Sequence, residues 1–409
     1  MVIGPDGIIA SVAPGEADLE PLDSLVGKLR SETREAGALA PAPVPIEGVA
    51  IEPPGPLSFP GKVIALPGDR LAVADSGHHR VLILDGDGSV QQVIGTGEAG
   101  LVDGVFSEAR LREPQGLAHD PEGDILFIAD RGNHAIREAD MTRGVLRTTA
   151  GAGALGRGVP RTAVPARALP LRSPWDVALA GDFLLIAMAG THQIWAFSRI
   201  DETISVLAGS GREGIQDGPF ATAALAQPSG LALDGPRLYF ADSETSAVRY
   251  LDLVKGEVHT LVGTGLFDFG DADGPRETAQ LQHPVGISKG PAGLLVADTF
   301  NSKIRAVDCE TGAVRTWFRN AGDVSLTEPA GLCQLADGRV VVADTNNQRL
   351  VEISPDGKVA RVLDVRLSPV SSADGDTSIP GATAHALRPV VVAPGDITLR
   401  VRLEPPEGF

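Results

Sequence analysis

A pattern of apolar and polar positions recurs six times along this chain of 409 residues. In each copy an apolar run ends in a turn-forming stretch, which usually begins with Asp, and apolar residues then return. Such a run, turn and second run predict two short strands joined by a tight turn. The copies occupy residues 71–85, 126–140, 184–198, 238–252, 294–308 and 340–354.

The spacing of the copies predicts the architecture, because tandem units of this kind share one continuous fold. Corresponding positions lie 55, 58, 54, 56 and 46 residues apart, which leaves room for four short strands and a loop. In the second copy we expect strands over 116–119, 125–129, 135–139 and 145–150. Four antiparallel strands repeated six times predict an all-β, six-bladed β-propeller over residues 56–364. A solenoid of β-α units does not fit, because no 3.6-residue periodicity appears inside any copy.

Glycine-rich loops connect the copies, and two of them match the GxGxxG pattern of dinucleotide sites, at 95–100 and 209–214. That interpretation fails because neither loop opens the helix of a βαβ unit. We expect these loops to carry the chain from the outer strand of one blade to the inner strand of the next. All six copies look complete from first to fourth strand, so no strand exchange between the first and last copy is expected.

The segments that flank the repeats are predicted separately. Residues 1–37 predict a hairpin, turned at 4–7, and one helix capped by Asp18, which together cannot close a core. Residues 38–55 are rich in Pro and Ala and predict a linker. Residues 365–409 predict a C-terminal β tail, in which two segments alternate well enough to be strands.

The charge balance excludes several classes of function. The chain has 35 Lys and Arg against 53 Asp and Glu, a formal net charge of −18. This charge argues against a nucleic-acid groove and against anionic membranes. No apolar run is long enough to cross a bilayer and no signal peptide opens the chain, so we expect a cytoplasmic protein. Cys309 and Cys333 lie in different copies without a CxxC pair, so both are expected to be unpaired.

The pattern L-x-V-A-D-[ST]-x-N-x-x-I-R, clearest at 126–137 and 294–305, resembles the NHL repeat. That family forms β-propellers, often with six blades, and the likeness covers most of the chain. A finer likeness is to the NHL propellers that follow a thioredoxin-like domain and precede a β-rich domain. It is carried by residues 173–177, 187–195, 227–230 and 282–286.

This resemblance implies that residues 1–37 are the end of a thioredoxin-like domain and that 365–409 begin the β-rich domain. The chain departs from this group in one respect, because it lacks the CxxC redox pair of a thioredoxin-like domain. Any thiol chemistry of the group is therefore absent from this chain.

Five copies carry an acid where the first strand of the pattern enters the turn: Asp75, Asp130, Asp242, Asp298 and Asp344. We expect each carboxylate to accept turn N–H groups, as in an Asx-turn, which is a structural role. The functional alternative is a ring of acids that binds cations. The third copy has Met188 at this position, which cannot accept such bonds, so a different closure of that turn is expected.

Three histidines, His79, His134 and His192, recur four residues after that position and suggest a zinc site. Geometry opposes this, because each sheet step moves a turn roughly 4.8 Å away from the axis. Side chains from three blades at that radius cannot converge on Zn–N bonds of about 2.1 Å. We therefore expect these rings to pack within the turns, and we assign no metal ligand.

The predicted inner strands point to a candidate site at the propeller axis. Each begins with a proline: Pro60, Pro114, Pro174, Pro228, Pro284 and Pro329. Two residues later four copies have glycine, which lets the backbones crowd together, whereas the other two have Lys62 and Asp176. We hypothesise that these charges line the channel mouth with Gln115 and Trp175 beside them, as a salt bridge or as a reactive pair.

These observations favour a non-catalytic scaffold that binds a protein partner, linked to a thioredoxin-like redox system, with no cofactor. The alternative is a metal-dependent, lactonase-like hydrolase or lyase with its site in the central channel. Calcium takes about six to eight oxygen ligands, and the starts of the inner strands offer only Asp176. RNA binding, known for some NHL domains, needs a basic face, which the net charge opposes. The identity of the protein partner does not follow from a fold.

Overall fold

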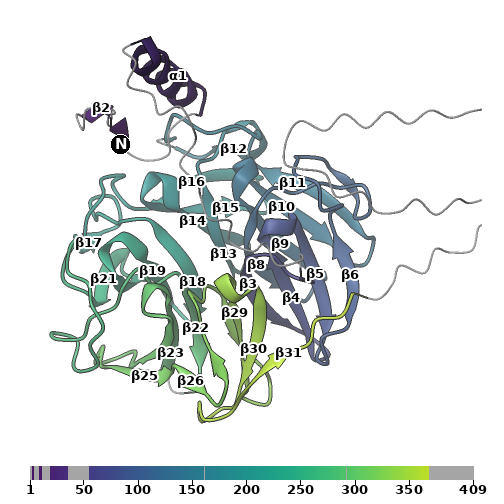
Figure 1. The fold of residues 1–409 in the computed structure, drawn as a ribbon, viewed down its shortest axis with the longest axis vertical. Helices are drawn as coiled ribbons and strands as arrows, with labels where there is room; N and C mark the ends of the chain where they lie inside the picture. Colours follow the sequence, from purple (N-terminus) through teal and green to yellow (C-terminus); the bar gives the residue numbers. More distant parts are fainter. Residues whose placement is uncertain are drawn as a thin grey trace, which may run out of the picture. The chain divides into compact units, whose positions relative to one another are not determined.

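The computed structural model describes residues 2–3, 9–11, 19–35 and 55–367, except 161 and 292. Residues 60 to 363 form six antiparallel sheets, each built on four main strands that are consecutive along the chain. Figure 1 shows these sheets arranged around a common axis in chain order. The predicted six-bladed β-propeller is therefore confirmed, and we number its sheets blades 1 to 6.

The N-terminal elements have the predicted types. Strands β1 (Val2–Ile3) and β2 (Ile9–Ser11) pair as an antiparallel hairpin, and helix α1 spans Leu19–Glu35. The predicted linker, up to residue 54, and the tail from residue 368 lie outside the described residues.

Blades 1 to 3 follow the predicted order, with the first strand of each blade at the axis and the fourth outside. In the second copy the observed strands begin and end within two residues of the expected ones. The strands are β3 (Pro60–Leu66), β4 (Arg70–Asp75), β5 (Arg80–Asp85), β6 (Val90–Ile94), β8 (Pro114–Asp120), β9 (Ile125–Asp130), β10 (Ala135–Asp140), β11 (Val145–Ala150), β13 (Pro174–Ala180), β14 (Phe183–Met188), β15 (Gln193–Ser198) and β16 (Thr203–Ala208).

Blades 4 to 6 repeat this order, and the loop between the last two blades carries a separate hairpin, β26 (Asn320–Ala321) and β27 (Val324–Ser325). The strands are β18 (Pro228–Asp234), β19 (Arg237–Asp242), β20 (Ala247–Asp252), β21 (Glu257–Val262), β22 (Gly286–Gly290), β23 (Gly293–Asp298), β24 (Lys303–Val307), β25 (Val314–Phe318), β28 (Leu332–Gln334), β29 (Val340–Asp344), β30 (Arg349–Ile353) and β31 (Ala360–Leu363).

The second strand of each blade is apolar without alternation because both of its faces are covered by neighbouring blades. In β4, for example, every residue from Leu71 to Asp75 is buried. Strands covered on both faces are expected to be continuous apolar runs. The core is accordingly a ring of six clusters, each filled by side chains of two successive blades. The cluster between blades 6 and 1 includes Leu57 and Val365, from the segments on either side of the repeats.

The glycine-rich crossing loops add a fifth edge strand to three blades, which the sequence did not predict. Each short strand pairs with the outer strand of the blade that the loop leads into: β7 (Gly104–Val105) with β11, β12 (Val164–Pro165) with β16, and β17 (Gly218–Pro219) with β21. Blade 5 has a single bridge of the same kind, between Gly274 and Val314.

A one-turn 3-10 helix joins the second and third strands of every blade and ends in a residue with a left-handed backbone, φ between 49° and 55°. We call the side of the propeller that carries these turns and the crossing loops the turn face. The turns are η1 (Ser76–His78), η2 (Arg131–Asn133), η4 (Ala189–Thr191), η5 (Ser243–Thr245), η6 (Thr299–Asn301) and η7 (Thr345–Asn347), and a further one, η3 (Ala166–Ala168), lies in a crossing loop.

The ring closes through residues that follow the last blade. Blade 6 lies beside blade 1, and Arg366 forms a parallel bridge with Ser89 at the edge of β6. The Arg366 N–H donates to the carbonyl of Gly88 at 2.9 Å, and its carbonyl accepts from Val90 at 3.0 Å. Its guanidinium pairs with Asp87 at 2.7 Å. Residues 364–367 thus occupy on blade 1 the edge that a crossing loop occupies on blades 2 to 5, although no main strand is exchanged.

Ending the chain after Leu363 is expected to lower the free energy of unfolding by about 3 kcal/mol, since two backbone hydrogen bonds and the burial of Val365 are lost. Urea unfolding compared with a chain that ends after Leu367 measures this effect. The shorter and longer chains unfolding at the same urea concentration would contradict this account of closure.

Candidate functional site

The recurring Asp ties its turn to the segment that leads into the same blade. In Asp242, which is fully buried, Oδ1 accepts the N–H of Ala226 at 2.8 Å and Oδ2 accepts Nη1 of Arg249 at 2.8 Å. In the other four blades Oδ1 accepts a lead-in N–H at 2.7 Å, from Ser58, Arg112, Gln282 and Thr327.

The predicted Asx-turn is therefore wrong. None of the five carboxylates caps the 3-10 turn that follows it. Oδ1 instead accepts the lead-in N–H, and Oδ2 accepts side chains, including the turn amides of Asn133, Asn301 and Asn347. The backbone of the turn is closed by its own hydrogen bond. In blade 4 that bond runs from the N–H of Ser246 to the carbonyl of Ser243 at 3.0 Å.

An arginine completes this network in all five blades. It stands seven residues after the Asp in blades 2, 4 and 5 and five residues after it in blades 1 and 6, as Arg137, Arg249, Arg305, Arg80 and Arg349. Arg249 also donates to the carbonyls of Ala224 and Gln216 and pairs with Asp217, all in the preceding crossing loop. In blades 2, 4, 5 and 6 the pair therefore anchors a crossing loop as well as a turn, and in blade 1 Arg80 donates instead to Pro56, before the first blade.

Blade 3 replaces this ion pair with apolar side chains. Met188 stands in place of the Asp and Trp195 in place of the arginine, and both are buried in the cluster between blades 2 and 3. The indole N–H of Trp195 donates to Gln193, whose amide donates to the carbonyl of Gly209. The backbone closure is unchanged, since the N–H of His192 still donates to the carbonyl of Ala189, so the expected different closure of this turn is wrong.

Side chains of the turns also join neighbouring blades. A hydroxyl at the first turn position donates to the proline carbonyl that opens the next blade, as Ser76 to Pro114, Ser243 to Pro284, Thr299 to Pro329 and Thr345 to Pro60. The last of these bonds links blade 6 to blade 1. Blades 2 and 3 carry Arg131 and Ala189 at this position and make no such bond.

The three recurring histidines make a second contact between blades. Nδ1 of His79, His134 and His192 accepts a backbone N–H at 3.2 Å from the residue before the next inner strand. In blades 4 and 5 the hydroxyls of Ser246 and Ser302 accept the equivalent bond. Each ring thus belongs to one junction between blades, which is a more specific position than the turn packing expected from the sequence.

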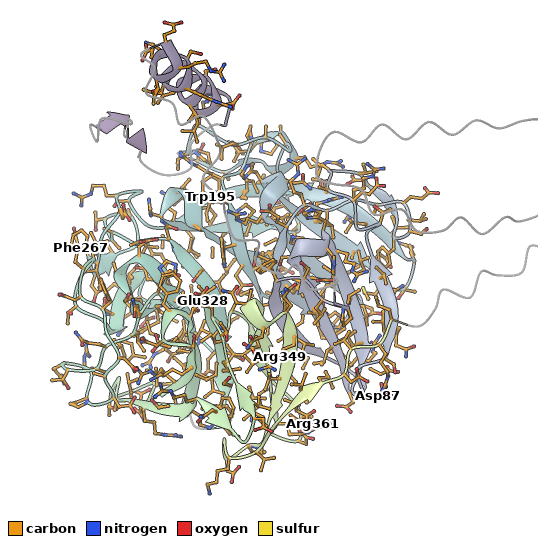
Figure 2. All side chains as sticks on the ribbon, viewed as in Figure 1. Asp87, Trp195, Phe267, Glu328, Arg349 and Arg361 are labelled. Carbon is orange, nitrogen blue, oxygen red and sulfur yellow. The ribbon has the colours of Figure 1, made fainter. Side chains whose placement is uncertain are left out.

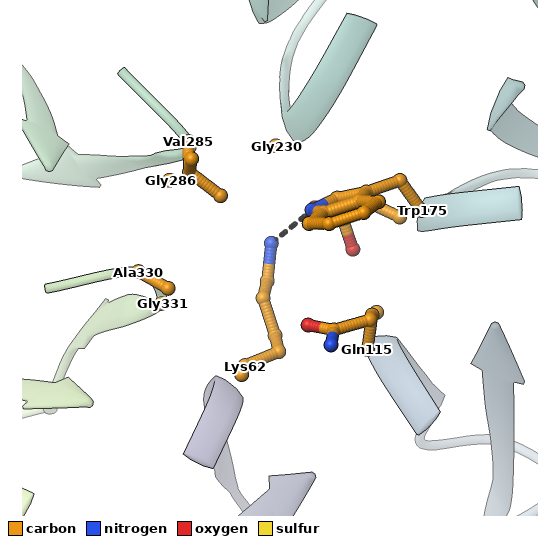
Figure 3. Close-up of a pocket in the computed structure, with 11 residues that line it drawn as sticks. Lys62, Gln115, Trp175, Gly230, Val285, Gly286, Ala330 and Gly331 are labelled. Carbon is orange, nitrogen blue, oxygen red and sulfur yellow. Dashed lines mark hydrogen bonds and ion pairs between the residues drawn. The ribbon is translucent and has the colours of Figure 1, made fainter. Parts of the chain in front are cut away.

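The four candidate residues of the hub lie together around the axis. Lys62, Gln115, Trp175 and Asp176 line one small cavity with the inner-strand glycines. Figure 3 shows the Lys62 side chain crossing the hub, where its ammonium pairs with Asp176 at 2.5 Å. Asp176 also accepts the N–H groups of Leu231 and Val177, at 2.8 and 2.9 Å. Burial raises the pKa of the Asp176 carboxyl, and the Lys62 ammonium opposes that rise.

The inner-strand glycines permit the close approach of the blades. A Cβ on Gly286 would lie 1.7 Å from the carbonyl oxygen of Ala330, and one on Gly331 would lie 2.5 Å from that of Gly61. Since the clashing atoms belong to the backbone, no side-chain movement can relieve them.

We expect Gly286→Ala to lower the free energy of unfolding by about 3 kcal/mol, because overpacking at this hub must displace a neighbouring strand. Gly158→Ala is the matched control, since its Cβ meets nothing within 4 Å. Thermal unfolding of both variants tests this. Equal melting temperatures for the two would show that the hub is less tightly packed than described.

The ion pair divides the channel. The cavity around it has a volume of about 20 Å³, room for roughly one water molecule. On the side away from the turn face, the inner strands enclose a funnel of about 340 Å³ whose lining is mostly aliphatic, with Lys62 at its base. Cys333 lies in the funnel wall, and burial raises the pKa of its thiol to about 12. Cys309 and Cys333 are both free, as expected.

A second cavity, of about 420 Å³, opens on the turn face between blades 2, 3 and 4, and sequence reasoning did not find it. Its lining includes Arg131, Trp175, His192, Glu213 and Glu244. The sequence did contain a signal for this cavity. Two successive blades lack the hydroxyl at the first turn position, and the residues that replace it, Arg131 and Ala189, line the cavity. Among the residues that the structure describes, no group of three His, Cys, Asp or Glu side chains is arranged to hold a metal ion.

This architecture defines a six-bladed β-propeller with an occupied hub and turns that share one bonding pattern. Residues 326–353 match the NHL repeat family, and the chain is an NHL-repeat β-propeller protein. It is 37% identical to NHL repeat-containing protein 2 of Homo sapiens over 410 residues, which cover 87% of this chain and 56% of that protein. It is 33% identical to the Arabidopsis thaliana protein SUPPRESSOR OF QUENCHING 1, chloroplastic, over 452 residues, which cover all of this chain and 42% of that protein.

The chain thus spans about half the length of the curated relatives it matches. Among solved structures, the streptogramin B lyase structure aligns with a TM-score of 0.49 and 12% identity, over 77% of this chain and 86% of that chain. A likeness of this size carries over no activity. No helix within the described ranges is long and apolar enough to cross a bilayer. Because one relative is named as chloroplastic, the cytoplasmic location stays a prediction.

Proposed function

We propose that this propeller is a non-catalytic scaffold that binds a protein partner on its turn face. The observation that carries the proposal is the hub, where a buried ion pair fills the position at which a propeller would hold a substrate. The cavity around the pair, of about 20 Å³, is far below the roughly 300 Å³ at which small-molecule sites begin, and the larger funnel of about 340 Å³ beyond it has a mostly aliphatic lining.

The alternative, a lactonase-like hydrolase or lyase with a metal in the channel, would need Asp176 as a ligand. That carboxylate already accepts two backbone N–H groups and the Lys62 ammonium. Breaking this pair to admit a cation would leave a buried ammonium without compensation, which costs several kcal/mol. The geometry therefore favours the scaffold.

The partner's context is part of the same proposal. Residues 1–37 belong to a thioredoxin-like domain, and 365–409 to a β-rich domain, so the propeller serves as the interaction platform of a redox-linked protein. The support is the sequence likeness to that group of NHL propellers and the observed hairpin and helix near the N-terminus. The redox cysteines themselves are not in this chain.

Photo-crosslinking from the two sides of blade 3 tests the scaffold function. A photoreactive phenylalanine analogue in place of Arg212 lies in a turn-face crossing loop, and one in place of Asp182 lies at the opposite end of the same blade. In extracts of the source cells we expect a discrete adduct from position 212, competed by unlabelled propeller, and none from position 182. Metal-dependent turnover of a lactone or ester panel, abolished in Asp176→Asn, would instead establish the enzyme.

A further inference from the structure

The 420 Å³ cavity on the turn face is built from three successive blades. Arg131, Gly190 and Glu244 come from the turns of blades 2, 3 and 4, and Glu213 from the crossing loop between blades 3 and 4. Trp175, from the inner strand of blade 3, forms a wall. The residue after the inner-strand proline is otherwise small or aliphatic, or is Gln, so blade 3 alone offers an aromatic surface there.

The charges around this cavity leave a net negative balance. The Arg131 guanidinium lies 5.3 Å from the Trp175 ring centroid and is paired with Glu113, so its charge is compensated within the protein. Glu213 is exposed, and within the described part of the chain no ion pair engages it. Among the residues that the structure describes, the charged partner of the remaining carboxylate, Glu244, is a histidine ring.

That histidine, His283, lies 4.0 Å from Glu244. Burial lowers the pKa of the His283 imidazole, although the Glu244 carboxylate opposes that fall, so the ring is a weak counter-ion for Glu244. The carboxylates of Glu213 and Glu244 therefore line a concave site together with Trp175, whose ring already carries the Arg131 guanidinium. A guanidinium or ammonium group gains from charge-assisted hydrogen bonds to the two carboxylates and from contact of its alkyl chain with the indole.

An exposed apolar track begins beside this cavity. The His283 ring stacks on Phe300 with centroids 4.5 Å apart, and Phe300 is half exposed. Asn301, the next residue, donates to the carbonyl of Gly270, which ties the loop bearing Phe267 and Phe269 to the same turn. Phe267 is 88% exposed and lies at the rim of the propeller (Figure 2). Exposed aromatic side chains that cluster next to a polar site are typical of interaction surfaces.

We propose that the cavity takes an arginine or lysine side chain of a partner segment, with flanking apolar residues of that segment on Phe300 and the 267–269 loop. This inference rests on the proposed scaffold function in one respect, that the cation belongs to a protein partner. The cavity itself is suited to any alkyl guanidinium or ammonium group. The net charge of −18 favours a basic partner by steering its approach.

Calorimetric titration with two neutral-backbone probes tests the cavity. Nα-acetyl-arginine methylamide is expected to bind, and its uncharged citrulline counterpart to bind about tenfold more weakly, because one charge-assisted hydrogen bond is worth about 1.5 kcal/mol or more. Glu244→Gln and Glu213→Gln should each weaken the arginine probe about tenfold. Glu108→Gln is the matched control, since it removes an equal charge from an exposed position of the crossing loop between blades 1 and 2 and does not line the cavity.

The apolar track is tested with a hexapeptide, acetyl-Gly-Arg-Gly-Leu-Gly-Leu-amide. Phe300→Ser should weaken the hexapeptide at least threefold and leave the acetyl-arginine probe unchanged, whereas Glu244→Gln should weaken both. If neither probe binds, or if both bind equally well to Glu244→Gln and to the wild type, the cavity is not a cation site. Thermal unfolding of each variant shows that the fold is intact.

The two proposals fail separately in these experiments. In one outcome the acetyl-arginine probe binds, no partner is cross-linked, and Phe300→Ser does not change the affinity for the hexapeptide. This outcome would show that the cavity binds a small free cation and would contradict binding of a partner segment. A cross-linked partner whose capture is unaffected by Glu244→Gln would keep the scaffold function and overturn the cavity's role in it.

Discussion

Asp242→Ala is expected to lower the free energy of unfolding by about 4 kcal/mol, one of the two largest effects predicted for this protein. The substitution leaves the fully buried guanidinium of Arg249 with the half-exposed Asp217 as its remaining counter-ion. Removing one partner of a buried ion pair costs about 3 to 5 kcal/mol, because the remaining charge stays away from water with weaker compensation. Equilibrium unfolding in urea, followed by tryptophan fluorescence, measures the loss.

Blade 3 supplies the control for this experiment, because it shows how the same position is filled without charge. The double variant Asp242→Met with Arg249→Trp copies Met188 and Trp195 into blade 4. It should recover at least half of the lost stability, since a well-packed apolar pair replaces a buried ion pair at little cost. A double variant no more stable than Asp242→Ala would show that blade 3 depends on neighbours that blade 4 lacks.

Asp176→Asn is the second large effect, with an expected loss of about 3 kcal/mol. The Lys62 side chain is 12% exposed and would face an uncharged amide in place of its counter-ion. Adding Lys62→Met should restore most of the stability, because the ammonium is then absent. Calorimetric unfolding of the single and double variants gives the coupling energy between the two residues. A coupling near zero would mean that the pair is solvated and that the hub is open.

Much of the propeller could be predicted from the sequence because the apolar runs, turns, prolines and glycines recur at equivalent positions in the copies. The apolar run from Leu71 to Ala74 is buried on both faces, and the same run recurs in every copy. The inner-strand prolines and the glycines after them placed Lys62 and Asp176 at the axis, where the structure brings them into contact. These predictions need only the residues of one copy, or a comparison of the residues at equivalent positions of the six copies.

The predictions that failed needed contacts between separate segments. The carboxylate of Asp242 accepts a bond from Ala226, which lies 16 residues earlier, and local turn chemistry could not show this. A signal was present, since an arginine stands five or seven residues after the Asp in each copy that has the Asp and at neither position in the copy that lacks it. The cavity between blades 2, 3 and 4 was missed for the same reason, because it needs residues of three copies.

The bond between Arg366 and Asp87 has a consequence for synthesis on the ribosome. These two residues are separated by 279 positions, so blade 1 emerges with one edge unfinished while roughly 15 to 55 s of translation pass at about 5 to 20 residues per second. During that interval the nascent chain exposes unpaired amide and carbonyl groups along β6. A chaperone or a neighbouring domain that shields this edge would protect the growing polypeptide until its last segment arrives.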